Sequence, residues 1–400
     1  MSLNSTPSAE RLHISLFGCR NAGKSSLVNA LTNQDVSVVS ETKGTTTDPV
    51  IKSMELLPIG PVVIIDTPGF DDEGDLGEKR VKKTRETLGR TDLAILVVDA
   101  TVGMKDDDRV LVQLFKDQSI PYLIVMNKED LLTDDKRNDD YVYVSSTTKK
   151  GLFELKELIG QKGVKAVNEK RLLADLVEPG DTVILVIPID ESAPKGRIIL
   201  PQQMAIRDLL DSQAMALCVQ VDELDGAIKS LKRPPKLVVT DSQAFKEVAK
   251  IVPETIDLTS FSILMARYKG FLDTAVYGVS KIRDLKDGDK ILISEGCTHH
   301  RQCGDIGTVK MPRWLKQMTS ADFSIETSSG KGFPDDLSPY AMVIHCGGCM
   351  VNEREMQTRM KRAIAQNIPF TNYGIAIAYM NGILERSLAS FPHLQALVKD

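Results

Sequence analysis

The chain has 400 residues and a formal net charge of −5 at pH 7, and 42% of its residues are hydrophobic, 26% charged and 5% aromatic. At roughly 100–200 residues per domain, this length predicts two or three domains with sizeable cores, and we expect three. The acidic net charge argues against a nucleic-acid partner. No apolar run approaches the ~20 residues that span a bilayer, and the N-terminus lacks the layout of a signal peptide. We therefore expect a cytoplasmic protein without a membrane partner.

A phosphate-binding loop is the first predicted motif. A buried strand over residues 12–17 precedes the pattern Gly-x-x-x-x-Gly-Lys-Ser, and a helical pattern follows it. Strand, glycine-rich loop and helix in this order are typical of a P-loop, whose backbone amides and helix N-terminus cradle phosphates. Lys24 can reach the β- and γ-phosphates, and the Ser25 hydroxyl can ligate magnesium. The expected phosphate-binding residues are Gly18, Asn21, Gly23, Lys24, Ser25 and Ser26.

A second motif supplies the acid that a magnesium–nucleotide site needs. The segment Asp66-Thr-Pro-Gly69 follows an apolar run at residues 61–65. It places a carboxylate at the end of a strand, where Asp66 can hold the magnesium shell and the Gly69 N–H can face the γ-phosphate. We therefore expect Asp66 and Gly69 to act in catalysis together with Lys24.

Two later motifs predict that the nucleotide is GTP. The segment Asn127-Lys128-Glu-Asp130 follows an apolar strand pattern. Asp130 can accept the N1 and exocyclic amino hydrogens of guanine, which adenine does not offer. A last short strand runs into Ser145 and Ser146, and the loop after it can offer a backbone amide to the guanine O6.

The P-loop and the segment that follows its helix resemble the TrmE-Era branch of GTPases. The likeness lies in residues 20–31, which match that branch's P-loop, and in residues 44–48, Gly-Thr-Thr-Thr-Asp, which match its first switch. The resemblance implies that Thr46 ligates magnesium when GTP is bound. It also implies that Asn21 coordinates potassium, as in the potassium-activated members. Thr47 departs from the pattern, because the branch often has arginine there.

The residue after the second motif bears on the rate of hydrolysis. Phe70 cannot orient an attacking water as a glutamine would, so we expect slow unaided hydrolysis. We also expect potassium to accelerate the reaction by supplying positive charge at the developing transition state. The expected catalytic residues are Lys24, Thr46, Asp66 and Gly69.

The middle of the chain alternates apolar runs with helical patterns. Strands are predicted at residues 182–189, 216–221, 236–240 and 255–258, with helices that begin near Gln202, Glu223, Ser242 and Ser260. This alternation indicates βαβ units around a small, mostly parallel sheet. We expect Cys218 to be a buried apolar residue. No catalytic or ligand motif occurs here, so the segment is expected to mediate association or communication.

Two cysteine-histidine clusters stand near the C-terminus. Three of the six cysteines lie in Cys297-x-His299 and His345-Cys346-x-x-Cys349, and each cluster follows a short apolar strand pattern. Six cysteines are too few for a disulfide scaffold, and clustered cysteines in a reducing cytosol favour metal binding or catalysis. The carboxyl ends of parallel strands meet at one edge of a sheet, so the two clusters can converge.

The residues alone leave three interpretations of this centre. Cys297, Cys346, Cys349 and one histidine can form a structural zinc site. Three cysteines with one replaceable position suit an iron-sulfur cluster equally well. A redox dithiol of Cys346 and Cys349 is less favoured, because it needs no third cysteine.

The whole chain resembles the HydF family, the maturation GTPases and scaffolds of iron-only hydrogenase, in the order GTPase, dimerisation domain and cluster domain. The resemblance implies that Cys297, Cys346 and Cys349 bind a 4Fe-4S cluster with an exchangeable fourth site, and that His299 and His345 are neighbours or occasional fourth ligands. It further implies a homodimer that receives a two-iron precursor. The implied partners are radical-SAM maturation enzymes and apo iron-only hydrogenase.

We therefore expect an α/β protein, with a P-loop GTPase domain at residues 1–175, a dimerisation domain at 180–262 and a 4Fe-4S domain at 263–400, the last two with mostly parallel sheets. Its expected cofactors are GTP, Mg²⁺, K⁺, the 4Fe-4S cluster and, transiently, the two-iron precursor. The main alternative is an Era-like GTPase in RNA modification or ribosome assembly with a structural zinc site.

Overall fold

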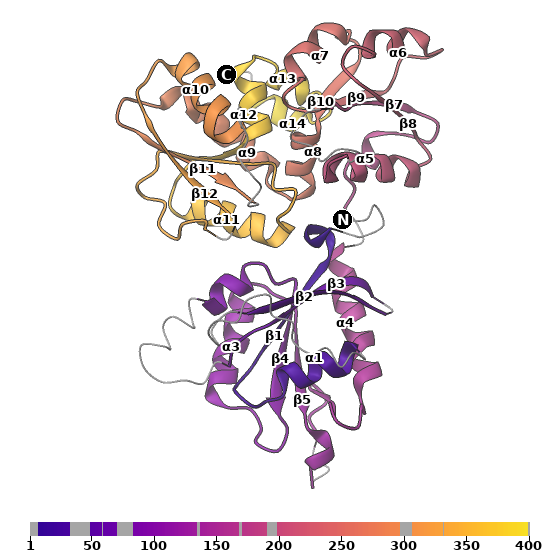
Figure 1. Ribbon diagram of the computed structural model, residues 1–400, viewed down its shortest axis with the longest axis vertical. Coiled ribbons are helices and arrows are strands. Elements are labelled where there is room, and N and C mark those ends of the chain that lie inside the picture. Colours follow the sequence, from indigo (N-terminus) through magenta and orange to yellow (C-terminus); the bar gives the residue numbers. More distant parts are fainter. Residues whose placement is uncertain are drawn as a thin grey trace. The chain divides into compact units, whose positions relative to one another are not determined.

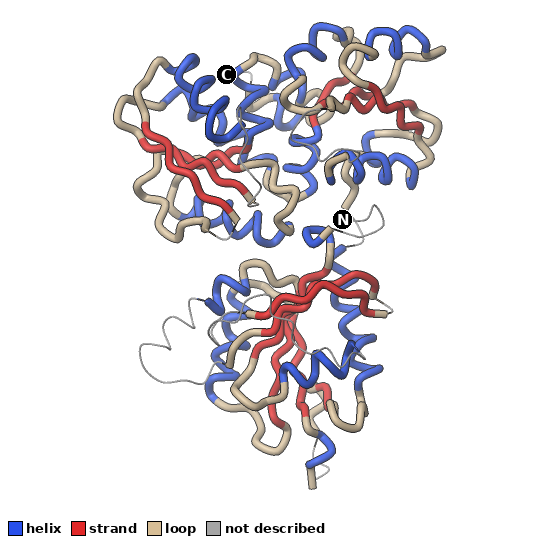
Figure 2. Tube along the Cα trace, viewed as in Figure 1, coloured by secondary structure: helices blue, strands red, loops and turns tan. Residues whose placement is uncertain are grey.

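The chain forms two compact units, Met1–Glu169 and Lys170–Asp400. The computed structural model describes residues 7–32, 49–57, 59–69, 83–133, 137–167, 170–189, 198–296, 306–330 and 332–398. Figures 1 and 2 show that helices cover the faces of sheets in both units, so the predicted α/β class is confirmed. Within these ranges, no helix combines the length and the apolar character needed to cross a bilayer.

The first unit is built on a six-stranded sheet with the order β2-β3-β1-β4-β5-β6. Strand β2 runs antiparallel to β3, and the other neighbouring strands are parallel. Its elements are η1 (Ser8–Glu10), β1 (Leu12–Phe17), α1 (Lys24–Thr32), β2 (Val50–Leu56), β3 (Gly60–Asp66), β4 (Leu93–Asp99), α3 (Asp106–Asp117), β5 (Tyr122–Asn127), η2 (Glu129–Leu131), β6 (Val142–Tyr143) and α4 (Leu152–Val167).

Helices pack on both faces of this sheet and create two cores. Leu12, Ile14 and Leu16 of β1 pack with residues of α1 and α4, whereas Phe17 packs with residues of α3 on the other face. Successive side chains of a strand point to opposite faces, so a strand that helices cover on both sides is buried on both faces. β1 is accordingly buried along its whole length, and its carboxyl end leads into the P-loop.

The second unit begins with a parallel four-stranded sheet of order β10-β9-β7-β8. The predicted strands and helices are confirmed with shifts of a few residues at their ends. The elements are η3 (Ala174–Leu176), β7 (Thr182–Val186), α5 (Leu200–Asp211), β8 (Met215–Val219), α6 (Leu224–Ser230), β9 (Leu237–Thr240), α7 (Phe245–Ile251), β10 (Asp257–Ser260) and α8 (Phe261–Tyr268).

The prediction of a buried Cys218 is wrong. Cys218 lies on β8, and its side chain is exposed. β8 has a neighbour only on its β7 side within the described sheet, and its residues are exposed or half-buried. An apolar run on an edge strand therefore looks in the sequence like a run on a central strand.

A second parallel sheet of order β12-β11-β13-β14 completes this unit. Strands β11 and β13 are neighbours, so the ends of the two strands that precede the cysteine clusters lie side by side. The remaining elements are α9 (Leu272–Val279), η4 (Ser280–Asp284), β11 (Lys290–Glu295), η5 (Ile306–Lys310), α10 (Met311–Thr319), β12 (Ser324–Ser329), β13 (Met342–His345), α11 (Glu353–Ala365), β14 (Phe370–Asn372), α12 (Tyr373–Met380), α13 (Leu384–Ser387) and α14 (Pro392–Gln395).

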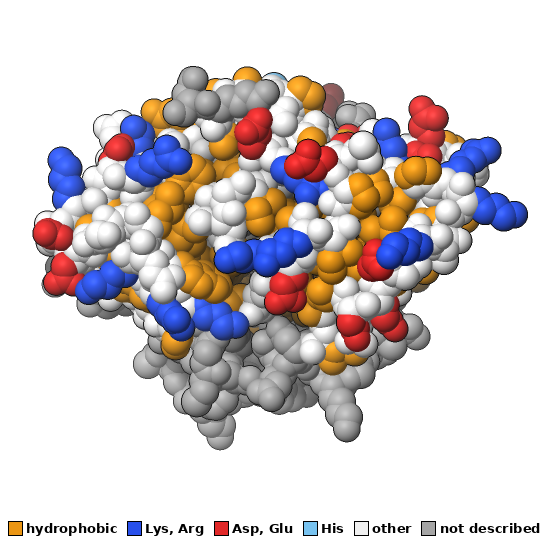
Figure 3. All heavy atoms as spheres, turned by 90° about the horizontal axis from the view of Figure 1, so that it is seen from above, with side chains coloured by type: hydrophobic (Ala, Val, Ile, Leu, Met, Phe, Trp, Pro, Cys, Tyr) orange, Lys and Arg blue, Asp and Glu red, His pale blue; other side chains and the backbone are white. Residues whose placement is uncertain are grey.

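One continuous core joins the two sheets of the second unit. It includes Val183 to Val186 of β7 as well as Ile291 to Ile293 of β11. The proposed division of this unit near residues 262 and 263 stays a prediction. Figure 3 shows one face of the molecule, on which basic and acidic side chains alternate with hydrophobic ones between them.

Candidate functional site

The predicted P-loop makes two close backbone contacts that only glycine permits. Gly18 has φ +135° and Gly23 has φ +89°. A Cβ atom on Gly18 would lie 2.1 Å from the carbonyl oxygen of Val97, and one on Gly23 would lie 2.3 Å from Nδ2 of Asn127. Glycine is therefore needed at both ends of the loop. The helix α1 begins directly after it, at Lys24.

The side chain of Lys24 folds back on this loop. Its Nζ donates to the carbonyl oxygens of Gly18 at 2.9 Å and of Cys19 at 2.8 Å, and the residue is 8% exposed. A buried ammonium requires acceptors, and the loop carbonyls provide two of them. The charge is thus held at the loop where the nucleotide phosphates are expected. Asn21, Ser25 and Ser26 are exposed on the loop and the first turn of α1.

Ser25 and Asp66 meet although 41 positions separate them. The Ser25 hydroxyl donates to Oδ2 of Asp66 at 2.6 Å, because the carboxyl ends of the parallel strands β1 and β3 lie side by side. Oδ1 of Asp66 is buried and has no hydrogen-bond partner among the described residues. An unsatisfied buried carboxylate oxygen is costly unless a cation ligates it. The pair therefore fits Mg²⁺, which prefers oxygen ligands.

Asn127 connects the P-loop to the loop that follows β6. Its Nδ2 donates to the carbonyl oxygen of Ala22 at 3.1 Å. Its Oδ1 accepts from the backbone N–H of Ser146 at 3.2 Å and from the Ser146 hydroxyl at 2.9 Å. Ser145 is fully buried, and its hydroxyl accepts from the N–H of Thr148 at 2.9 Å. The motifs predicted to bind phosphate and guanine thus form one hydrogen-bonded network.

Lys128 is fixed by its backbone and by an ion pair. It has φ +65°, and its Nζ lies 2.5 Å from Oδ2 of Asp99 at the end of β4. Burial raises the pKa of Asp99, but hydrogen bonds from Lys128 and Thr101 outweigh it and hold that pKa below its usual value. Asp99 is therefore ionised at neutral pH and keeps Lys128 beside the nucleotide loops.

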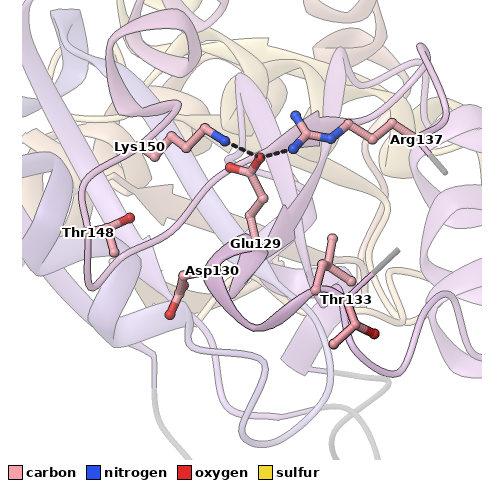
Figure 4. Close-up of a pocket in the computed structure, with 7 residues that line it drawn as sticks. Glu129, Asp130, Thr133, Arg137, Thr148 and Lys150 are labelled. Atoms are coloured by element: carbon pink, nitrogen blue, oxygen red, sulfur yellow. Dashed lines mark hydrogen bonds and ion pairs between the residues drawn. The ribbon is translucent and has the colours of Figure 1, made fainter. Parts of the chain in front are cut away.

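Asp130 borders a cavity of about 590 Å³ between η2 and the loop after β6. Sequence reasoning missed the residue before it, Glu129, which is 6% exposed. Lys150 lies 3.0 Å from Oε1 of Glu129, and Arg137 pairs with the same oxygen. Figure 4 shows the Glu129 side chain pointing toward both cations, while Asp130 points away from them. Glu129 thus fixes the turn that carries Asp130.

The cysteine loop follows β13 and meets the end of β11. The Sγ atom of Cys346 accepts from the backbone N–H of Gly296 at 3.1 Å and from that of Gly348 at 3.4 Å. Gly348 has φ +66°, and a Cβ there would lie 2.8 Å from Sδ of Met356. Backbone N–H groups commonly donate to metal-bound thiolates and stabilise the charge on their sulfur. Gly296 directly precedes Cys297 in the sequence.

His345 is fully buried, and both of its ring nitrogens have partners. Nδ1 lies 2.9 Å from the carbonyl oxygen of Cys346, and Nε2 lies 3.0 Å from Nη1 of Arg359. Because Nη1 can only donate, Nε2 accepts and Nδ1 donates. Burial, together with the charge of Arg359, lowers the pKa of His345 to about 3. This geometry favours a hydrogen-bonding role over a fourth-ligand role.

Several predicted residues lie outside the described ranges, namely Thr46, Thr47, Phe70, Cys297 and His299. Within the described ranges, no group of three or more His, Cys, Asp or Glu side chains is arranged to hold a metal ion. Cys346 and Cys349 are partly buried and form no disulfide within the part of the chain that the structure describes. Burial raises the pKa of the Cys349 thiol.

Comparisons with curated proteins match the first unit to GTPases. The chain is 40% identical over 123 residues to the tRNA modification GTPase MnmE of Desulforamulus reducens, covering 30% of this chain and 26% of that protein. It is 39% identical over 157 residues to MnmE of Legionella pneumophila strain Paris, covering 38% of this chain and 34% of that protein. The chain thus spans about a third or less of these relatives.

A crystal structure of an Era variant from Aquifex aeolicus bound to GDP·AlF4⁻ is 20% identical, with a TM-score of 0.33, and covers 52% of this chain and 93% of that one. The profile described as 50S ribosome-binding GTPase matches residues 13–128. The profiles of the Hydrogen maturase F dimerization and tetramerization domains match residues 172–270 and 273–390. A GTPase domain followed by these two domains identifies the chain as a member of the hydrogen maturase F (HydF) family.

Proposed function

We propose that the chain is a GTP-hydrolysing scaffold that holds a 4Fe-4S cluster and a two-iron precursor and delivers the precursor to apo iron-only hydrogenase. The observation that carries this proposal is the hydrogen bond from Gly296 N–H to Sγ of Cys346. It joins the strand end that leads into Cys297 to the loop of Cys346 and Cys349, in a chain with both hydrogen maturase F domains.

The first unit supplies the groups for GTP hydrolysis. Ser25 and Asp66, with Thr46, would surround Mg²⁺, and the contact between Ser25 and Asp66 supports this assignment. Lys24 would neutralise charge on the β- and γ-phosphates, and the Gly69 N–H would face the γ-phosphate. Catalysis then rests on placing positive charge and donors where negative charge develops.

Potassium would provide a further positive charge at the P-loop. Asn21 is exposed on that loop and has φ +63°, so its side chain is accessible to a ligand. Phe70 offers no group that can orient water, which is why an added cation is expected to matter. We assign slow, potassium-activated hydrolysis to this unit, and a slow reaction suits a timing switch.

Cys297, Cys346 and Cys349 would hold the 4Fe-4S cluster. The donor set fits, because Cys346 of this Cys-x-x-Cys loop accepts from two backbone N–H groups that can stabilise charge on its sulfur. When bound, the cluster supplies an iron with an exchangeable position for the precursor. The ring of His345 supports this loop through the Cys346 carbonyl, and His299 remains a candidate for the open position.

We assign homodimer formation to the domain at residues 172–270. Strand β8 presents an exposed edge with Met215 and Cys218 exposed on it. Unpaired strand edges readily pair with a second chain. The partners of the assembled dimer would be the radical-SAM enzymes that build the precursor and the apo-hydrogenase that accepts it.

Anaerobic purification tests this proposal. We expect a brown protein with about four irons per chain. Cys346→Ala should abolish the cluster and leave GTP turnover within about twofold, because the two sites lie in separate units. A colourless protein with one zinc per chain would instead support a GTPase with a structural zinc site in RNA modification or ribosome assembly.

A further inference from the structure

A buried lysine lies directly against the cysteine loop. Lys269 follows the last residue of α8 and is 1% exposed, which makes it one of the largest fully buried side chains of the chain. Its Nζ donates to the carbonyl oxygen of Gly348 at 2.8 Å and to that of Val351. Both acceptors belong to the segment that contains Cys349. The ammonium therefore bridges the two sides of the turn around this cysteine.

The lysine comes from a distant part of the sequence. Lys269 and Gly348 are 79 positions apart. Lys269 lies within the match to the dimerization domain at 172–270, whereas the cysteine loop lies within the match to the tetramerization domain at 273–390. The contact thus links the two family domains inside the second unit.

The backbone around Lys269 holds it at this place. Its N–H donates to the carbonyl oxygen of Met265 in the last turn of α8. Its own carbonyl oxygen accepts from Nε2 of Gln357 at 3.4 Å, on the helix α11 that follows the cysteine loop. Gly270, with φ +70°, turns the chain immediately afterwards, and a Cβ there would lie 2.6 Å from Nε2 of Gln357. The lysine is therefore anchored at both the main chain and the ammonium.

The ammonium of Lys269 holds the turn on both sides of Cys349, because its two acceptors, Gly348 and Val351, flank that cysteine in the chain. A cation at this place lies close to any negative charge that the cysteine loop carries. Opposite charges attract more strongly in a buried site than in water.

We propose that Lys269 is a positioning residue that fixes the Cys346–Cys349 loop for the cluster and places a positive charge beside it. This inference rests on the proposed function, since it assumes a resident 4Fe-4S cluster. A fixed cation stabilises the more negative, reduced form of a nearby cluster and so raises its reduction potential. It also makes cluster retention depend on a residue of the dimerization domain.

Three full-length variants test this role after anaerobic reconstitution. Lys269→Met removes the charge and the donors at similar volume, and Lys269→Gln keeps a neutral N–H donor. Lys281→Met is the matched control, because Lys281 has a side chain that is 43% exposed and pairs with Asp284 on η4. The measurements are the potential from an EPR-monitored redox titration and the rate of iron loss to a chelator.

We expect Lys269→Met to shift the potential to a more negative value and to lose iron about tenfold faster than the unsubstituted chain. Lys269→Gln should shift the potential similarly and lose iron more slowly than Lys269→Met. Lys281→Met should match the unsubstituted chain in both measurements. A merely structural lysine would change iron loss and leave the potential of the remaining cluster unchanged.

An unchanged potential of the cluster that remains in Lys269→Met would overturn the inference, whatever the rate of iron loss. If circular dichroism shows that Lys269→Met does not fold, the potential of Lys269→Gln is the test instead. An unshifted potential in Lys269→Gln would then overturn the inference. A chain that binds no iron before any substitution contradicts the proposed function itself. These two failures are therefore distinguishable.

Discussion

The Ser25 hydroxyl donates to Oδ2 of Asp66 at 2.6 Å, while Oδ1 of the same carboxylate is buried without a hydrogen-bond partner among the described residues. Asp66 thus has one oxygen held by Ser25 and one left for a cation. If this cation is Mg²⁺, both Ser25→Ala and Asp66→Asn should reduce GTP turnover by about 100-fold or more, because the ion's charge stabilisation is lost.

The measurement is steady-state GTP hydrolysis as a function of Mg²⁺ concentration. Thr32→Ala is the control on the same helix, because its hydroxyl donates to the carbonyl oxygen of Asn29 at the far end of α1. Thr32→Ala should retain turnover within about twofold. Full activity of Asp66→Asn at the Mg²⁺ concentrations that support the unsubstituted chain would show that hydrolysis does not need a Mg²⁺ ion bound at Asp66.

Asn127→Ala should weaken GDP binding by roughly 10–100-fold, because it removes three hydrogen bonds worth about 0.5–1.5 kcal/mol each from a buried network. Isothermal titration calorimetry measures this directly. Asn138→Ala, at an exposed asparagine of the same unit, should bind GDP normally. Equal affinities of the two variants would show that the network does not shape the nucleotide site.

Potassium should accelerate GTP hydrolysis relative to sodium, and Asn21→Ala should abolish that difference. The reason is that the exposed Asn21 of the P-loop is expected to coordinate the cation that supplies charge to the transition state. Turnover measured in matched potassium and sodium buffers checks this. Equal rates in both buffers for the unsubstituted chain would contradict the role of Asn21.

Met215→Lys combined with Cys218→Lys should weaken dimerisation, because charges on an edge strand oppose pairing with another edge. Light scattering during size-exclusion chromatography measures the mass of the particle. Leu57→Lys, at an exposed position of the first unit, should leave the mass unchanged. A dimer that survives both β8 substitutions would place the interface elsewhere.

Arg267 donates to both carboxylate oxygens of Asp175, at 2.9 Å from Nη1 to Oδ1. Arg267 lowers the pKa of Asp175, although burial opposes it. The folded pKa is therefore below the unfolded value, so the pair stabilises above about pH 4 and this stabilisation is lost as pH falls through the folded pKa.

Asp175→Asn should therefore lower the free energy of unfolding near pH 6, and its difference from the unsubstituted chain should shrink toward about pH 2. Denaturant unfolding at several pH values checks this. Asp284→Asn, at an exposed carboxylate, is the control. A difference that does not change with pH would show that the Asp175 contribution is not electrostatic.

The sequence predicted most of the features that depend on residues close together in the chain or on a known motif. The strand at residues 12–17 and the P-loop follow from a buried apolar run and a glycine pattern with strict backbone needs. Helix α11 begins after Asn352, a residue type favoured at helix starts, and its side chain accepts from the N–H of Glu355 at 3.1 Å. Parallel strands then bring Ser25 and Asp66 together.

The residues that the sequence did not reveal act on side chains or backbone of other elements of the fold. Lys269 donates to the carbonyl oxygen of Gly348, 79 positions away in the chain. Arg359 on α11 donates to Nε2 of His345 on β13. Neither contact leaves a periodic signal, because each depends on how the helices pack on the second sheet. Glu129 was missed because its role depends on Arg137 and Lys150, which come from different loops.

Under the proposed function, the sulfur atoms of Cys297, Cys346 and Cys349 hold a 4Fe-4S cluster with one open iron position. EPR spectroscopy of the reduced, anaerobically purified protein, with and without imidazole, tests it most directly. We predict a 4Fe-4S signal that changes when imidazole binds at the open position. An iron signal that imidazole leaves unchanged, or a protein that contains zinc alone, would contradict the claim.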